Sequence, residues 1–164
     1  MAGFFPRDVV HWADEHLHPL RAFSLRTIEL AGLTGVIVRV FRALVLGASG
    51  WFVFVAGVVA GLIFLCGMLT WHLGNYPLRH WPMRLMGFAI VEITAELGMS
   101  TLLIAFGRER YGSGIATWID WWPMAGNTAV GRIVVLGLYA LVLAGTVKLV
   151  RRMVDRRATP AVRT

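Results

Sequence analysis

Residues 51–71 read WFVFVAGVVAGLIFLCGMLTW, an uninterrupted apolar run with a tryptophan at each end. A helix rises about 1.5 Å per residue, so about 20 apolar residues cross a hydrocarbon core roughly 30 Å thick. Tryptophan favours the boundary between lipid and water, and we expect Trp51 and Trp71 to anchor the two ends of this helix. The stretch predicts a transmembrane helix and, with it, an all-α integral membrane protein.

Two further segments have the length and hydropathy of a span. Residues 85–106 are apolar except for two glutamates, and residues 129–150 are apolar with Arg132 near one end and Lys148 near the other. Basic side chains near the end of a span can extend along the helix to reach water. Arg132 and Lys148 can therefore reach the membrane surface from their positions in this span.

Residues 27–46 form an ambiguous fourth segment, because they have the length to span but contain Arg39 and Arg42. This segment either crosses the bilayer or lies flat in the interface. Cytoplasmic flanks of spans collect Lys and Arg. If the segment lies flat, the basic residues divide evenly between the two sides of the membrane. If it spans, both termini share a side, and their side collects most of the basic residues: Arg7, Arg21, Arg26, Arg79, Arg84, Lys148, Arg151, Arg152, Arg156, Arg157 and Arg163, against Arg108, Arg110 and Arg132.

The second arrangement has the usual inside bias, so the sequence predicts about four transmembrane helices with both termini cytoplasmic, and three plus one interfacial helix as the alternative. In this arrangement residues 1–26 are a cytoplasmic amphipathic segment and residues 27–150 are the helical bundle, with spans at 27–46, 51–71, 85–106 and 129–150. Residues 108–128 form an outer loop, and residues 151–164 a basic cytoplasmic tail.

Composition agrees with a chain built mainly of membrane spans. Of 164 residues, 57% are hydrophobic and 15% are charged. About a quarter of the residues are charged in an average soluble protein. The single cysteine, Cys66, lies in an apolar run, so neither a disulfide framework nor a cysteine-based metal site is expected. The basic tail is most simply an anchor near anionic lipid, and we expect no nucleic-acid partner.

The third span carries the most informative polar residues, Glu92 and Glu96. Four residues apart on a helix, the two carboxylates fall on one face. A charge at that depth is costly and usually meets a partner or water. In the four-span arrangement Arg39 and Glu96 lie at nearly the same depth in the membrane, so the two side chains could form an ion pair. The alternative is that Arg39 and Arg42 mark an interfacial helix, while the carboxylates are protonated or meet another subunit.

A proton or ion relay is a second hypothesis for the two glutamates. A relay normally needs further acidic or histidine residues at successive depths, and the spans offer only Thr94, Ser100 and Thr101 nearby.

Histidine is a common ligand of haem and of metals. His72 and His80 flank a short loop, and the remaining histidines lie in the polar N-terminal segment, so no two of them face each other across spans. The sequence therefore predicts no cofactor or metal of the chain's own. His72 is a weak candidate for contact with a haem or pigment shared with a partner, and bound lipid is also expected at such an interface.

Gly57 and Gly61 form a GxxxG pair, which lets a second helix approach closely. The pattern does not distinguish an internal neighbour from a partner subunit.

Two segments outside the spans show helical apolar stripes. Ile115, Trp118, Ile119 and Trp122 recur at helical spacing before Pro123, which predicts a short interfacial helix with Trp118, Trp121 and Trp122 as anchors. Near the start, Val9, Val10, Ala13 and Leu17 predict a similar surface helix that ends at Pro19. Contact with lipid is the simpler reading of both stripes, and docking onto a larger assembly the sharper one.

The sequence shows no convergent nucleophile, base and metal ligands, and no internal repeat typical of transporters. We therefore expect a non-catalytic accessory or structural subunit of a larger complex in a bacterial-type inner membrane, with respiratory and photosynthetic complexes as the first place to look. The alternative is a small transporter or proton-conducting subunit that uses Glu92 and Glu96. Water reaching both carboxylates favours conduction, and burial against arginine favours a structural role.

Overall fold

The computed structural model describes residues 27–47, 50–112 and 114–158, and these residues form four long helices and one short hairpin. The helices are α1 (Thr27–Gly47), α2 (Trp51–Gly74), α3 (Trp81–Ala105) and α4 (Trp121–Ala158). A single 3₁₀ turn, η2 (Leu78–His80), precedes α3. The predicted surface helix near the N-terminus lies outside the described residues.

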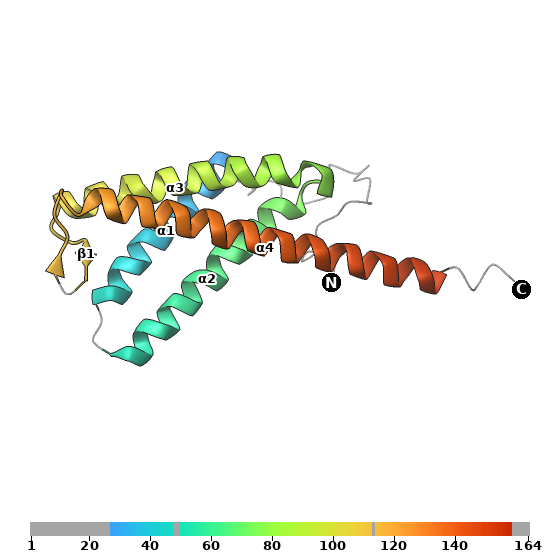
Figure 1. The fold of residues 1–164 in the computed structure, drawn as a ribbon, viewed down its shortest axis with the longest axis horizontal. Helices are drawn as coiled ribbons and strands as arrows, with labels where there is room; N and C mark the ends of the chain where they lie inside the picture. Colours follow the sequence, from blue (N-terminus) through green and yellow to red (C-terminus); the bar gives the residue numbers. More distant parts are fainter. Residues whose placement is uncertain (1–26, 48–49, 113, 159–164) are drawn as a thin grey trace, which may run out of the picture.

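Three helical segments are long and apolar enough to cross a membrane: Trp51–Gly74, Leu78–Ala105 and Trp121–Val154. The fold class predicted from the sequence is thus confirmed in its coarser part, an all-helical chain with three such helices. α1 has the predicted length and packs most extensively against α3, with α2 as its second neighbour. Figure 1 shows α1 crossing α3 at a slant, with the C-terminal end of α1 beside the start of α2.

Side chains from all four helices form one apolar core. Leu65, Leu69 and Leu73 of α2 recur every four residues and point into it. They meet Phe88 of α3 and Leu136 of α4. Within this core the Thr70 and Tyr139 hydroxyls lie 2.6 Å apart and share a hydrogen bond, which satisfies two polar groups between α2 and α4.

The interfacial helix predicted over residues 115–122 is wrong. Strand β1 (Arg110–Tyr111) pairs antiparallel with β2 (Gly114–Ile115), and a turn leads into α4 at Trp121. The carbonyl of Asp120 accepts the first helical hydrogen bond, from the Met124 N–H at 3.2 Å. Pro123 therefore lies in the first turn of α4, where its missing N–H costs nothing, rather than after a helix.

α4 is also longer than predicted at its other end, because it continues through Arg151 and Arg152 to Ala158. Residues 151–158 contain no proline or glycine, and arginine and methionine are good helix formers. The expected boundary between the span and a separate tail therefore does not exist in the backbone. In Figure 1 the last turns of α4 extend beyond the other three helices.

Candidate functional site

The most unusual feature of the fold is a polar stretch on the buried face of α3. Phe88, Glu92, Glu96, Ser100 and Ile104 follow one another at intervals of four residues, and all five are buried. Residues at this spacing lie one above another on a helix. The face that α3 turns toward its neighbours is therefore apolar at both ends and carries two carboxyl groups and a hydroxyl between them.

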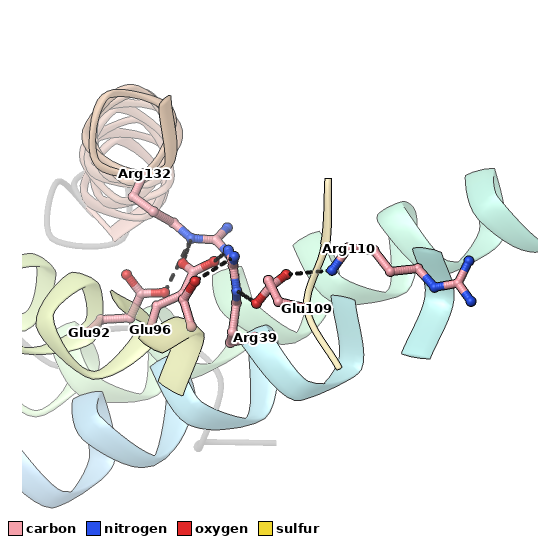
Figure 2. A network of polar contacts seen from close by, with 7 residues as sticks. Arg39, Glu92, Glu96, Glu109, Arg110 and Arg132 are labelled. Carbon is pink, nitrogen blue, oxygen red and sulfur yellow. Dashed lines mark hydrogen bonds and ion pairs between the residues drawn. The ribbon is translucent and has the colours of Figure 1, made fainter. Parts of the chain in front are cut away.

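Arg39 of α1 reaches this face from one side (Figure 2). Its Nη2 donates a hydrogen bond to Ser100 Oγ at 2.9 Å, and its Nη1 lies 3.6 Å from Glu96 Oε1. The proximity of Arg39 and Glu96 that the matched depths predicted is thus confirmed. The Arg39 side chain is only 1% exposed, so its charge depends on protein groups for stabilisation.

Arg132 of α4 reaches the same carboxylates from the other side. Its Nε donates to Glu96 Oε2 at 2.7 Å and lies 3.3 Å from Glu92 Oε1. The Arg132 side chain, which could have extended along its helix toward the end of the span, instead turns inward to these carboxylates and is 15% exposed. The two buried carboxylates attract the guanidinium and so favour this inward position over full hydration of the charge.

Glu109, which follows α3, completes the cluster and ties the hairpin to α1. Its Oε2 accepts a hydrogen bond from Arg39 Nε at 2.9 Å, and its side chain is 1% exposed. Its Oε1 accepts from the backbone N–H of Arg110 at 3.3 Å, and its carbonyl accepts from Ala116 N–H. The Arg110 side chain points away from the cluster in Figure 2. Arg39, Glu92, Glu96, Ser100, Glu109 and Arg132 are hereafter called the charge cluster.

Gly35 explains how α1 comes close enough to α3 for these contacts. A Cβ at this position would collide with the carbonyl oxygen of Glu92 and would lie 2.9 Å from the backbone nitrogen of Glu96. The two helices therefore touch through their backbones one turn before Arg39. Only glycine permits such an approach, as in small-residue contacts between membrane helices.

Several oxygens of the cluster lack a hydrogen bond among the described residues. Neither carboxylate oxygen of Glu92 accepts a hydrogen bond from these residues, nor does Oε1 of Glu96, although Glu92 Oε1 lies 3.3 Å from Arg132 Nε and Glu96 Oε1 lies 3.6 Å from Arg39 Nη1. Glu92 and Glu96 are both completely buried. Chemically, the cluster can join α1, α3, α4 and the hairpin by electrostatic attraction, and Glu92 can hold a proton. A nucleophile beside a base, the pairing that covalent catalysis needs, is not among the contacts of the cluster.

His72 lies in the apolar core rather than at an open surface. Its ring is 3% exposed, stacks on Phe88 with the ring centres 5.4 Å apart, and meets Tyr76 edge-on. Its Nε2 has no hydrogen-bond partner among the described residues. Contact with a shared cofactor at this position stays a prediction, and such a contact needs the packing around the ring to open.

The other predicted site residues have separate positions. Arg42 is exposed and makes no hydrogen bond or ion pair within residues 27–47, 50–112 and 114–158. Gly57 and Gly61 face α1: a Cβ at Gly57 would lie 2.5 Å from Val45 Cγ1, and one at Gly61 would be 3.7 Å from Phe41. The GxxxG pair of Gly57 and Gly61 therefore packs against a helix of the same chain, α1.

The tryptophans divide into two groups. Trp51, Trp71, Trp118 and Trp122 have exposed side chains, Trp51 to 78%. Trp121 is half-buried and packs against the small cluster of Ile104, Ala116 and Met124, with its ring edge-on to Trp122. Four of the five expected anchors are thus exposed, whereas Trp121 mainly joins the start of α4 to the end of α3.

Sequence reasoning missed the roles of Glu109, Arg132, Ser100 and Gly35. The available signal was the four-residue spacing of Ser100 with Glu92 and Glu96, which places a third polar group on the same face. For Glu109 the sequence carries no such signal, because it lies in a loop whose path depends on the hairpin.

Within the described part of the chain, no group of three or more His, Cys, Asp or Glu side chains is placed to hold a metal ion. Comparisons with protein-family models, with curated proteins and with solved structures found no match to this chain.

Proposed function

We propose that this protein is a non-catalytic accessory or structural subunit of a larger complex in a bacterial-type inner membrane. The observation that carries the proposal is the burial of Glu92 and Glu96 against Arg39 and Arg132. A conducting glutamate needs access to water, whereas a carboxylate enclosed by arginines contributes to the arrangement of helices. The charge cluster fits the second description.

In this proposal α1 is a fourth span and both termini are cytoplasmic. Gly35 meets Glu92 and Glu96, and Arg39 reaches Ser100 and Glu109, so successive turns of α1 meet successive turns of α3. The two helices therefore run in the same direction. This parallel packing supports a spanning α1 over the interfacial alternative, because α3 is itself long and apolar enough to cross.

The first half of α2 provides the surface for a partner. Its side chains from Trp51 to Ile63 are exposed except at Gly57 and Gly61, and only 11% of its most apolar stretch is buried within the chain. A span that packs on one neighbour along half of its length leaves aromatic and aliphatic groups available to a second protein. Respiratory and photosynthetic complexes are the first candidates. The proposal includes no cofactor of the chain's own, while lipid, haem or pigment at the partner interface remains part of it.

Extraction of the natively expressed protein in a mild detergent tests the proposal. We expect a particle far larger than the 18.2 kDa chain. Val59→Trp with Ile63→Trp should reduce its size, because the new side chains suit lipid but block close packing on α2. Val134→Trp with Leu138→Trp, which alters two exposed residues of α4, is the matched control. A monodisperse monomer extracted from native membranes would contradict the proposal.

A proton-conducting or transport role is the second candidate, and Glu92 is the observation that favours it. A fully buried carboxyl group without a hydrogen bond from the described residues is a reasonable place for a proton. Proton flux into liposomes containing the purified chain separates the two candidates. Flux that Glu92→Gln abolishes without loss of thermal stability would favour conduction over the structural role.

A further inference from the structure

A cavity between α1, α2 and α4 is lined by polar groups most of which lie outside the charge cluster. Its volume is 340 Å³, within the range of ligand sites in proteins, about 300–1,000 Å³. Arg42 of α1 and Arg132, Asn127 and Thr128 of α4 line one part of it. The remaining lining is mainly aliphatic and aromatic. The cavity thus combines two cations and two polar groups with an apolar wall.

Arg42 distinguishes this cavity from an ordinary gap between helices. A guanidinium has five N–H donors, and those of Arg42 have no acceptor among the described residues. Arg132 uses its Nε for Glu96, and its side chain remains 15% exposed beside the cavity. In an apolar surrounding, a cation without acceptors is costly. An anion with several oxygens would satisfy both arginines, and phosphate matches guanidinium geometry especially well.

The depths of the polar groups match those of a membrane lipid. Arg42 lies five residues before the end of α1, and Asn127 six residues after the start of α4, so each is about 8–9 Å from its helix end. Val135 and Leu62 lie deeper along their helices and are apolar. A second hollow of 180 Å³ shares Val38, Phe41 and Gly61 with the first and is almost entirely apolar.

We propose that this cavity binds one anionic phospholipid from the leaflet at the end of α1 and the start of α4. The headgroup phosphate accepts hydrogen bonds from Arg42 and from the free donors of Arg132, with Asn127 beside it. The acyl chains lie along the apolar wall toward the bilayer centre. The cavity and the lipid therefore match in two ways. The arginines match the charge of the phosphate, and the change from polar to apolar lining with depth matches the change from headgroup to acyl chain. This inference does not depend on the accessory-subunit proposal.

Native mass spectrometry of the full purified chain, titrated with dioleoyl phosphatidylglycerol or dioleoyl phosphatidylcholine, tests the proposal. We expect the first phosphatidylglycerol to bind about 10-fold more tightly than the first phosphatidylcholine, a difference of about 1.4 kcal/mol. Arg42→Gln should bring the ratio close to one. Arg79→Gln, which removes an exposed arginine of η2 at the other end of the bundle, should leave the ratio unchanged.

A second pair of variants tests the cavity itself. Gly131 lines the cavity, and a Cβ at this position would meet nothing within 4 Å. The side chain of Gly131→Leu should therefore occupy part of the cavity and weaken the binding of both lipids. Gly137→Leu adds the same side chain to α4 at a position that is equally open but outside the cavity, and should have no effect. Equal affinity for the two lipids in the unaltered chain would overturn the proposal, as would binding indifferent to both Arg42→Gln and Gly131→Leu. Tight binding of oleate in place of phosphatidylglycerol would likewise overturn it, in favour of a fatty acid.

Discussion

Arg39 of α1 and Glu109 of the loop after α3 form a hydrogen-bonded ion pair at 2.9 Å, although seventy residues separate them in the chain. The pair joins α1 to the hairpin that precedes α4. Arg39 also contacts Ser100 and Glu96, so a single guanidinium holds three points along α3 and its continuation. Removing a partner of such a buried charge is more damaging than removing the charge with its partner.

Glu96→Gln should lower the free energy of unfolding by about 3–5 kcal/mol, because both arginines then lose a buried counter-charge. Glu96 is closer to Arg132, at 2.7 Å, than to Arg39, at 3.6 Å. Adding Arg132→Met should therefore recover more stability than adding Arg39→Met. Melting curves of the variants in detergent provide the measurement. Strictly additive losses in both double variants would argue against these contacts.

Gly35→Ala should destabilise the bundle by about 1–3 kcal/mol, since the new Cβ forces α1 away from the backbone of α3. Gly32→Ala is the matched control on the same helix, because a Cβ there meets nothing within 4 Å. The control should gain about 0.5–1 kcal/mol from better helix propensity. If the two variants melt at the same temperature, the close approach at Gly35 is not needed for stability.

Glu109→Gln should loosen the hairpin and cost about 1.5–3 kcal/mol, the usual value of a hydrogen bond to a charged group. Amide hydrogen exchange over residues 110–116 is expected to quicken, because the carboxylate anchors this segment to Arg39. Arg110→Gln should leave exchange unchanged, since among the described residues Glu109 accepts from Arg110 through the backbone N–H, which the substitution keeps. Equal exchange in all three proteins would show that the hairpin holds its shape without Arg39.

The start of α4 should respond to acid through Asp120. Hydrogen bonds from the backbone N–H and the hydroxyl of Thr117 hold the pKa of Asp120 below its usual 3.8. A carboxyl whose pKa is lower in the folded chain contributes its stabilisation above the unfolded value and loses it as the pH falls through the folded one. The protection of residues 117–124 from amide exchange, relative to the intrinsic exchange rate at each pH, should therefore fall below about pH 4.

NMR titration of the Asp120 carboxyl carbon checks this expectation directly. Thr117→Val removes the hydroxyl donor and should raise the measured pKa of Asp120 toward 3.8. Thr101→Val, on α3, removes a hydroxyl that bonds only to its own helix and should leave the pKa of Asp120 where it was. No change in the Thr117 variant would show that the hydroxyl does not stabilise the carboxylate.

The proposed topology places both termini in the cytoplasm and the hairpin on the opposite face. Reporter fusions at residues 5 and 160 should therefore respond as cytoplasmic, and one at Gly112 as external. This orientation is expected because basic residues are in excess on the side of the membrane that holds the two termini. If the two termini are found on opposite sides of the membrane, the number of spans is odd. The alternative with three spans and an interfacial α1 would then be favoured.

Helices α2, α3 and α4 could be predicted from the chain because each contains a long apolar run, whereas α1 has the length of a span but its Arg39 and Arg42 left its placement open. The predicted and observed starts of α1 and α2 agree, and α3 starts four residues early because Pro82 fits the first turn of a helix. The error at residues 115–122 arose because an apolar stripe at helical spacing does not show which backbone hydrogen bonds form. In the structure, Arg110 pairs with Ile115 and Tyr111 with Gly114 in a hairpin, and this hairpin replaces the start of the predicted helix.

Spacing alone placed Glu92 and Glu96 on one helix face and made a buried partner necessary, because intervals of four residues repeat on a helix and charge is costly away from water. The identity of the partners depended on which helices lie beside that face. Arg132 reaches the cluster because α4 packs beside α3, and Glu109 reaches it because of the path of the loop after α3. Neither arrangement can be read from the order of residues in the sequence. Gly35 is the clearest case: as a letter it resembles any other glycine of the chain, and only the crossing of α1 and α3 makes its missing side chain necessary.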